Sequence, residues 1–567
     1  MERSSILRFA IIAIAVLVFM KWGGPALGLW GGDEKPQALP EEKYVDAPGF
    51  EPDTVDAPAD PAKGRNPPPA EGELCKIAGN RFDATLSTRG AALKHFKLEG
   101  SKYDEMDLST TPDQERWRSL RTLFRGPEGG DQLKYDRFVW KLDPPDGKSC
   151  TFKYEDEDVR IVKKVSVTER PFELAVDTTV TNLASAPKKH TLSISTHAYR
   201  LLKDVKGGMG RQSPFSTELS CAAGKDVVKK GKDEFKAGWV AVPGVDRYAA
   251  VNSHYFAQAM VPMGEPARCE ILAEDWLAAG QTKKDDDAPT VYHAKLVYPA
   301  KELAPQASAT YSQIAFFGPK ERDVLDYAAG DSKLKDILYL GYFTPVARFL
   351  VGVLRFFHGI IGNWGISIFL MTVCLRLALF PLSLKQIKTT IAMRKLKPEV
   401  DSLNEKFKDD AQAKNLAMME LWKKHGVNPF GGCLPQLVQM PVWFAMYTTL
   451  QTAVEMYHTK FLWFADLSAP DKFYVLPLLL GGLMIVQQRI VPQQGMDPVQ
   501  QKMMMYMLPI VFTVMMLFLP AALGVYMLTN SLLGISQQLI VERVAPRNAG
   551  GGGGAGIVVK EKGKARV

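Results

Sequence analysis

The chain has 567 residues, a formal net charge of +8 at pH 7 and a mean hydropathy of −0.09. This length exceeds that of one compact domain, so several unlike domains are expected. The eight histidines and six cysteines show no HExxH, CxxC or other zinc-ligand spacing, which argues against a metal-dependent enzyme.

The N-terminal part contains two segments of contrasting composition. Residues 6–20 are apolar and follow two arginines, as in signal peptides and N-terminal anchors. Ala26–Gly28 would suit a cleavage site, but the apolar character continues to residue 30, so an uncleaved transmembrane anchor over residues 1–30 is the other interpretation. Residues 31–73 contain nine prolines and eleven acidic residues and are predicted to form an extended, exported linker.

Residues 74–330 are predicted to form a soluble, all-β sandwich domain. Val159–Val167, Phe172–Val180 and Thr290–Tyr298 alternate between polar and apolar residues with a period of two and are separated by turn residues. The domain holds four cysteines, at positions 75, 150, 221 and 269. They can pair if the domain is exported, but free buried thiols fit the sequence equally well.

Residues 331–361 change to a helical period. Apolar residues recur every three or four positions between Leu338 and Phe357, while Lys335, Arg348 and Arg355 mark another face. This pattern predicts an amphipathic helix lying in the outer membrane interface. A core helix of the soluble domain is the alternative.

Five apolar segments follow, at 363–384, 434–454, 472–489, 504–520 and 522–541, and each approaches the length of a membrane span. The loop 385–425 has ten Lys/Arg against six Asp/Glu, and residues 542–567, a basic and Gly-rich tail, have six against two. Both are therefore expected in the cytoplasm. The predicted fold is a membrane α-helical bundle, comprising a five-helix core (362–541) and the N-terminal anchor, with a soluble all-β sandwich outside.

The loop 385–425 is predicted to be a hairpin of two short helices. Val400, Leu403 and Phe407 form one apolar stripe, and Leu416, Met419 and Trp422 form another. Five lysines give the hairpin a basic exterior and are candidates for cytoplasmic docking of the ribosome or targeting factors: Lys395, Lys397, Lys406, Lys423 and Lys424. A positive-inside loop with no partner is the alternative.

Arg376 lies inside the apolar stretch 365–381, where a charge costs about 2.5–3.5 kcal/mol on insertion scales. Thr372 lies one helical turn earlier on the same face. The next charge, Lys385, is nine residues on, or about 13 Å along a helix. Two interpretations are open: Arg376 forms a helix-packing ion pair or snorkels to the interface, or it faces a polar, water-accessible pocket within the membrane.

Other polar residues share the apolar segments: Gln436, Gln439, Tyr526, Thr529, Asn530, Ser531, Gln537 and Gln538. Such groups are costly against lipid unless they are bonded or hydrated. The segments contain no central carboxylate, Walker motif or GxSxG motif, so neither a proton relay nor an energy-using site is predicted.

Methionine is concentrated in the same region, with twelve of the 22 methionines lying between Met440 and Met527. Methionine suits surfaces that accept many apolar partners, and it also fills gaps between helices. We consider Met440, Met505 and Met516 candidates for a hydrophobic slide.

Several short motifs together resemble one family: Phe317–Lys320, Phe357–Gly365, Arg376 before Phe380–Leu382, Val427–Cys433, Pro435, Gln439–Pro441, Asp466–Ser468, Asp497–Pro498, Gln500–Lys502 and Gln537–Gln538. They are similar to the YidC family of membrane protein insertases, of the Gram-negative type with a large periplasmic domain. The resemblance implies a five-helix core around a polar groove that opens to the cytoplasm and inner leaflet. It also implies a periplasmic β-sandwich like that of sugar mutarotases, used without their chemistry.

By the same resemblance, the groove residues of the family match Arg376, Thr372, Gln439 and Tyr526. The chain departs from close relatives at Val525, where a second tyrosine is frequent, and in its tail, where Gly550–Gly554 replaces part of a dense basic run.

We therefore expect an ATP-independent insertase and chaperone of the bacterial inner membrane, without cofactor or enzymatic activity. The expected partners are nascent membrane proteins, the ribosome, the Sec translocon (SecYEG and SecDF) and the lipid bilayer, and DNA is not among them. One alternative is a small-solute transporter, which would show inverted repeats that are not found. Another is a membrane-tethered periplasmic sugar enzyme, for which His254 and His293 are candidates by residue type.

Overall fold

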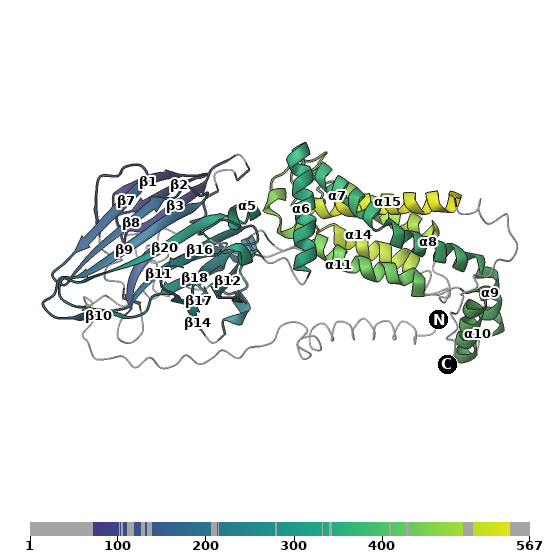
Figure 1. Ribbon diagram of the computed structural model, residues 1–567, viewed down its shortest axis with the longest axis horizontal. Coiled ribbons are helices and arrows are strands. Elements are labelled where there is room, and N and C mark those ends of the chain that lie inside the picture. Colours follow the sequence, from purple (N-terminus) through teal and green to yellow (C-terminus); the bar gives the residue numbers. More distant parts are fainter. Residues whose placement is uncertain are drawn as a thin grey trace, which may run out of the picture.

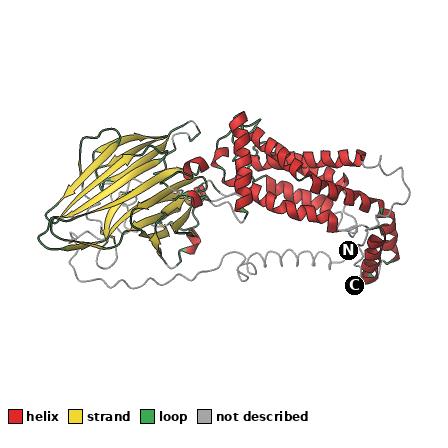
Figure 2. Cartoon of the chain, in the orientation of Figure 1, coloured by secondary structure: helices red, strands yellow, loops and turns green. Residues whose placement is uncertain are grey.

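The computed structural model describes residues 72–544, apart from short internal segments of which the longest are 110–117, 133–138, 206–212 and 491–502. Within this range the strands and the long helices form two separate bodies (Figure 2). The predictions for the anchor, the linker and the C-terminal tail lie outside the described residues.

The β body contains two large antiparallel sheets. In the described residues the first has nine strands in the order β13 (Asp226–Gly231), β12 (Glu218–Ala223), β15 (Tyr248–Asn252), β16 (Phe256–Met263), β20 (Ser308–Pro319), β9 (Glu173–Asn182), β8 (Val159–Val167), β7 (Ser149–Glu155) and β6 (Lys141–Leu142). The second has six, in the order β14 (Val240–Val245), β17 (Ala267–Asp275), β18 (Pro289–Val297), β11 (Leu192–Leu201), β4 (Arg121–Arg125) and β5 (Asp131–Gln132).

Two smaller sheets complete this body. One contains β1 (Leu74–Gly79), β2 (Phe82–Ser87) and β3 (Ala92–Leu98), and the other pairs β10 (Lys188–His190) with β19 (Lys301–Leu303). The two large sheets face each other, because Thr196 of β11 donates to Gln258 of β16 over 3.0 Å. Alternate residues of β8, such as Val159 and Ile161, are fully buried between them. The predicted β-sandwich is confirmed.

Two disulfides cross-link the β body. Cys75–Cys150 joins β1 to β7, and Cys221–Cys269 joins β12 to β17. Each bond therefore connects strands of different sheets. The structure thus selects pairing over free thiols, the two alternatives that the sequence left open.

The helical body begins with α6 (Thr344–Ile361), which runs across the direction shared by α7 (Trp364–Ala378), α11 (Phe430–Thr452) and α15 (Ala521–Val544) (Figure 1). Ala347, Leu350 and Leu354 are buried in the core of the helical body. Phe349, Phe356 and Ile360, on the other side of α6, are 65–67% exposed. The helix is thus apolar on two sides and packs against the helical body, not inside the β-sandwich. It starts at Thr344, later than the predicted 331.

The remaining helices are more broken than the sequence suggested. The predicted span 363–384 is divided between α7 and α8 (Phe380–Lys395), which meet at a bend of 65° just before Pro381, a residue that disrupts the preceding helix. The predicted span 504–520 starts with a π-helix, η7 (Met503–Met507), and continues as α14 (Leu508–Met516). The segment 472–489 gives α12 (Val475–Ile490).

Length and hydropathy therefore identify few spans. Among the described helices, α6 alone passes as a span by these measures, and the bent α7–α8 pair passes if it is taken as one span. α6 lies across the direction of α7, α11 and α15 (Figure 1). The predicted segment 363–384 is therefore two helices joined at a bend and not one straight helix.

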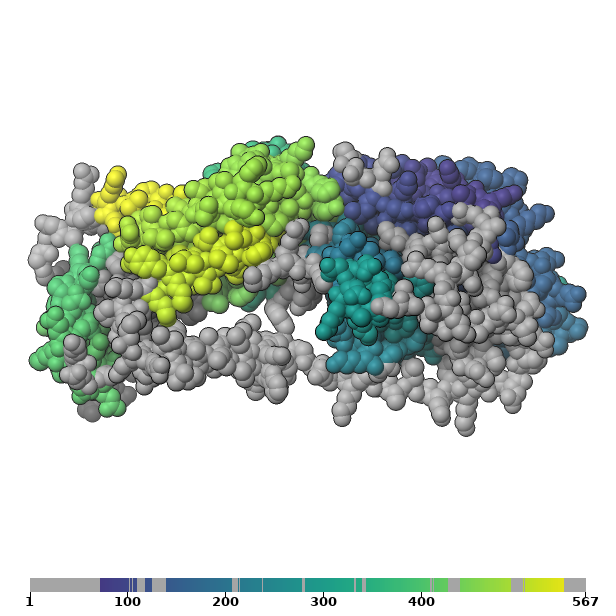
Figure 3. All heavy atoms as spheres, turned by 180° about the vertical axis from the view of Figure 1, so that it is seen from behind, coloured from purple at the N-terminus to yellow at the C-terminus, as the bar shows by residue number. Residues whose placement is uncertain are grey.

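The two bodies are in contact (Figure 3), and the contact includes the residues at the C-terminal end of α11. Val454, in the 3₁₀ turn η6 (Val454–Met456), and Tyr457 belong to the buried core of the β body. The Tyr457 ring packs against Tyr255 and Phe256. His254 Nε2 lies 2.7 Å from the carbonyl oxygen of Gln451, one of the last carbonyls of α11, which lack intrahelical partners. A side chain of the β body thus caps the C-terminal end of α11.

Candidate functional site

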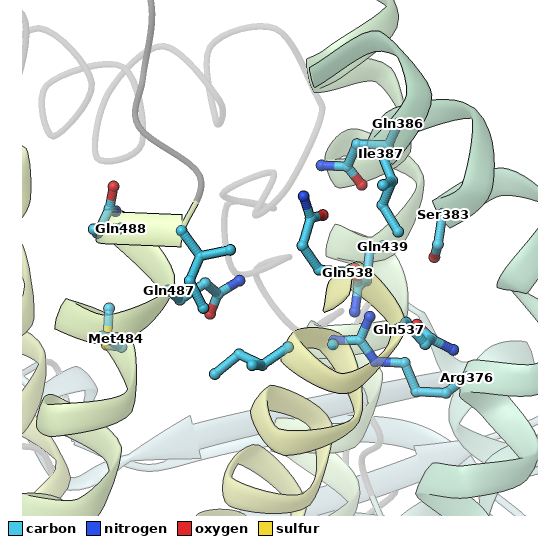
Figure 4. Close-up of a pocket in the computed structure, with 13 residues that line it drawn as sticks. Arg376, Ser383, Gln386, Ile387, Gln439, Met484, Gln487, Gln488, Gln537 and Gln538 are labelled. Carbon is cyan, nitrogen blue, oxygen red and sulfur yellow. The ribbon is translucent and has the colours of Figure 1, made fainter. Parts of the chain in front are cut away.

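A polar cavity of about 310 Å³ lies between α7, α8, α11, α12 and α15. Glutamines dominate its lining: Gln386, Gln439, Gln487, Gln488, Gln537 and Gln538. Figure 4 shows that they come from several helices around the cavity, together with Arg376 and Ser383. Glutamine both donates and accepts hydrogen bonds, so this lining can solvate a polar chain of varied sequence.

Arg376 lies in the last turn of α7 and extends toward the helix that carries Gln537 and Gln538 (Figure 4). Its Nε donates to Oδ1 of Asn530 over 2.6 Å, and its Nη2 donates to the carbonyl oxygen of Asn530 over 2.8 Å. In the described part of the chain no carboxylate forms an ion pair with Arg376. Its positive charge is therefore held in place by a neutral partner and remains uncompensated beside the cavity.

Two of the four groove residues suggested by the resemblance do not line the cavity. Thr372 is fully buried, and its hydroxyl donates to the carbonyl oxygen of Ile368 over 2.6 Å. Tyr526 is 1% exposed and lies in the core of the helical body. Thr372 lies one helical turn before Arg376, and Tyr526 lies one turn before Asn530. At this level α7 and α15 pack closely against each other. Helical spacing placed Thr372 near Arg376. It could not reveal that the cavity beside Arg376 closes one turn away, where the two helices are in close contact.

The hydroxyl of Tyr526 is buried and has no hydrogen-bond partner among the described residues. A buried polar atom of this kind requires water or another polar group. Gln439, the fourth of these residues, does line the cavity.

The methionines predicted to form a hydrophobic slide have different environments. Met440 is 43% exposed, and Met505 is partly exposed on η7. Met516 is only 2% exposed and packs inside the helical body. For Met516 the prediction of a contact surface is wrong, because the residue fills a gap between helices, the alternative role of methionine.

The hairpin at the far end of the molecule from the β body consists of α9 (Lys397–Lys406) and α10 (Ala411–Lys424) (Figure 1). Val400, Met418 and Leu421 form its small core. Leu416 and Met419, predicted on the packed face of α10, are instead 61% and 60% exposed. Each residue advances a helix by about 100°, so the face centred on Met418 turns these two away. All five candidate docking lysines are exposed.

The histidines proposed for a sugar enzyme are occupied in structural contacts. His254 bonds to Gln451, as described above. His293 belongs to a hydrogen-bonded chain that runs inward from Glu274 through His293 and His197 to Ser195, with separations of 2.9–3.0 Å. The described residues contain no group of three or more His, Cys, Asp and Glu side chains that could hold a metal ion.

Sequence reasoning missed several residues of the site. Ser383, Gln386, Gln487 and Gln488 line the cavity but lie at ends of apolar segments, where polar residues are ordinary. Asn530 was noted as a polar residue but not as the partner of Arg376. The signal that could have found it is a spacing of four residues on α15, since Asn530, Gly534 and Gln538 lie on one helical face.

Comparison with known proteins covers both bodies. Residues 74–353 match the family model described as YidC periplasmic domain, and residues 356–548 match the 60Kd inner membrane protein family. A membrane protein insertase YidC of Anaeromyxobacter dehalogenans is 36% identical over 501 residues, which cover 84% of this chain and 87% of that protein. The corresponding protein of Nitratidesulfovibrio vulgaris is 32% identical and is covered over 98% of its length.

Solved structures show more distant likenesses. A crystal structure of an active YidC insertase with its first transmembrane domain resolved is 16% identical, covers 83% of this chain and 92% of its own, and has a TM-score of 0.35. A galactose mutarotase-like protein from Lactobacillus casei is 14% identical, covers 43% of this chain and all of its own, and has a TM-score of 0.32.

Proposed function

The chain belongs to the YidC family of membrane protein insertases, and we propose that its polar cavity receives the exported segment of a nascent membrane protein. The protein inserts other proteins into the bacterial inner membrane, and its β-sandwich is a periplasmic domain. The observation that supports a role for the cavity is Arg376, which Asn530 holds beside about 310 Å³ of glutamine-lined space without a carboxylate partner in the described residues.

A polar segment that crosses hydrocarbon loses its hydration and therefore faces a large free-energy cost. Glutamine side chains and water in the cavity replace much of that hydration. A carboxylate in the segment is also attracted by Arg376, and the attraction is stronger than in water because the surroundings have a lower dielectric constant. The cavity thereby lowers the barrier to translocation of a short exported segment.

The apolar helix of the substrate then leaves the protein for lipid, beside Met440 and Met505. Burial of this helix is the driving force, at about 25 cal/mol per Å² of apolar surface removed from water. No nucleotide is needed, because the protein lowers the barrier to insertion while burial of the substrate helix makes insertion favourable.

The topology follows from charge. With the domain 74–330 in the periplasm, the basic hairpin 385–425 and both termini lie in the cytoplasm, and α6 lies in the outer interface. The anchor 1–30 and the linker 31–73 precede this domain, the interfacial segment 331–361 and the core 362–541 follow it, and the tail is 542–567. Exposed lysines of the hairpin dock the ribosome, and the Sec translocon works beside the core.

The test uses three single-span substrates whose exported tails are acidic, neutral or basic. Proteoliposomes contain equal amounts of the wild-type protein, Arg376→Lys, Arg376→Ala or a control, Arg489→Ala, which removes an exposed arginine of α12 that does not line the cavity. Arg376→Ala should lose the acidic-tailed substrate most, whereas Arg376→Lys and the control should retain much of the activity. Equal loss for all three tails, with a lower melting temperature, would show that Arg376 is structural.

A further inference from the structure

A second arginine lies at the end of the cavity nearest the hairpin. Arg394, in the last turn of α8, donates from Nη2 to Oε1 of Glu542 over 3.0 Å and also to the carbonyl oxygen of Ile490. Gln538 Nε2 donates to the same Glu542 oxygen over 2.5 Å. Ile490 and Gln538 both line the cavity, so this cluster lies at its rim.

Both arginines contact one slanted row of α15, formed by residues spaced four apart. Asn530, which binds Arg376, and Glu542, which binds Arg394, are separated by twelve residues, or about 18 Å along the helix. Gly534 and Gln538 occupy the turns between them, because positions four apart lie on one face. The cavity therefore has a positive group at each end of the same stripe.

The two arginines differ in how their charge is compensated. Arg376 has only a neutral partner in the described residues, whereas Arg394 is paired with the carboxylate of Glu542. Arg394 is not saturated, since its buried Nε has no acceptor among the described residues. Its side chain is 36% exposed and that of Glu542 is 23% exposed, so solvent and an entering chain can reach the pair.

We propose that Arg394 is a second, specificity-determining anion site at the rim of the cavity, occupied at rest by Glu542. An aspartate or glutamate of an entering exported segment replaces Glu542 on the partly exposed Arg394 guanidinium and then moves inward to Arg376. This inference rests on the proposed role of the cavity. At rest the Glu542 carboxylate keeps the rim close to neutral, so it competes directly with acidic substrates.

Removing the charge of Arg394 and removing that of Glu542 should have opposite effects on the insertion of an acidic segment. Removing the Arg394 charge deprives an acidic segment of its first partner. Removing the Glu542 charge vacates that partner and removes a like charge from the path. A purely structural ion pair predicts the same direction for both changes, because either one breaks the bond between α8 and α15.

The experiment compares the full-length proteins Arg394→Gln, Glu542→Gln and Arg394→Lys in proteoliposomes, with acidic, neutral and basic exported tails. For the acidic tail we expect Arg394→Gln to lower insertion and Glu542→Gln to raise it, each roughly three- to tenfold, with little change for the neutral tail. Arg394→Lys keeps the charge and should retain most of the activity. It also serves as the test if Arg394→Gln does not fold.

Changes of the same sign for Arg394→Gln and Glu542→Gln, or equal changes for all three tails, would overturn the rim site. So would an Arg394→Lys protein that loses acidic and neutral tails alike. Arg376→Ala is measured in parallel. If it remains selective for the acidic tail while the rim variants are not, only the rim site fails. If Arg376→Ala affects all tails equally, the proposed role of the cavity itself fails.

Discussion

The guanidinium of Arg376 packs directly over the backbone of Gly534. A methyl group built at position 534 would lie 3.0 Å from Nη2 of Arg376 and 3.4 Å from its Cζ. Gly534 follows Asn530 by one turn of α15, so the helix both anchors the arginine and leaves room for it. A larger residue at position 534 requires the guanidinium of Arg376, which is bonded to Asn530, to move by a few tenths of an ångström.

We therefore predict that Gly534→Ala weakens insertion selectively. Hydrogen bonds to charged groups are each worth about 1.5–3 kcal/mol, similar to the cost of overpacking, so the guanidinium should shift rather than leave. Insertion of the acidic-tailed substrate should fall by roughly threefold, less than in Arg376→Ala.

Gly482→Ala is the matched control for this substitution, because a methyl at this helical position of α12 meets no atom within 4 Å. Both substitutions raise helix propensity, so only the contact with Arg376 distinguishes them. Equal activity of the two variants on the acidic tail would contradict the role given to Gly534.

The position of Arg376 was predictable from sequence because a charge in an apolar helix requires a special environment. Its partner was not, because a neutral asparagine carries no signal that separates it from other polar residues of α15. Thr372 and Tyr526 were placed near the site by spacing and by resemblance, yet close packing of α7 against α15 buries both. Packing of this kind depends on where two helices cross, which periodicity within one helix does not reveal.

The second prediction concerns the hairpin. Deleting Glu399–Trp422 should abolish insertion while leaving a stably inserted protein, since the core of the hairpin is limited to contacts between α9 and α10. The exposed lysines, and the apolar Leu416 and Met419 beside them, are then lost as contact groups. The measurement is insertion by equal amounts of the two proteins in inverted membrane vesicles. Normal insertion by the deleted form would exclude a docking role.

A milder variant separates the contribution of the lysine charges from that of the exposed apolar residues. Changing Lys423 and Lys424 to glutamine keeps α10 intact and should weaken ribosome co-sedimentation, more so at low salt, where exposed charges are less screened. Unchanged co-sedimentation at all salt concentrations would assign docking to the apolar residues instead.

The third prediction concerns the periplasmic domain. Removing Leu74–Gly318 while keeping α6 should spare insertion of small substrates, because every residue lining the cavity belongs to the helical body. The deletion exposes Val454 and Tyr457 and removes the bond from His254 to α11. We therefore expect a lower melting temperature together with retained activity. Loss of insertion at normal protein levels would show that capping of α11 is essential.

The architecture was predictable where one pattern dominates a long segment. Period-two alternation found β8 at its observed bounds, Val159–Val167. Pro381 signals the bend between α7 and α8, but hydropathy alone does not show it, because Leu379–Leu382 is as apolar as the helices around it. The contact between Tyr457 and the β core was also missed, since it joins residues some two hundred positions apart and no local pattern records it.

The last prediction concerns pH. Burial and nearby Lys301 lower the pKa of His190 to about 4, and burial with neighbouring cationic groups also lowers the pKa values of His197 and His293. In the unfolded chain a histidine has a pKa of about 6.5. Between these values only the unfolded state binds the proton, so the β-sandwich should be fully stable above pH 6.5 and lose stability as the pH falls toward 4.

For His190 the difference of 2.5 pH units, from 6.5 to about 4, corresponds to about 3 kcal/mol at most. Hydrogen exchange of the β10 and β20 amides in the full-length protein, corrected for intrinsic exchange, measures the effect at pH 7.5 and pH 5. His190→Gln removes this titration and should reduce the dependence to what His197 and His293 contribute, although losing the 2.9 Å contact with the Tyr311 hydroxyl lowers stability at both pH values. His425→Gln, which changes an exposed histidine of the hairpin, should keep the wild-type slope. The assignment fails if His190→Gln and the wild-type protein lose protection equally between the two pH values.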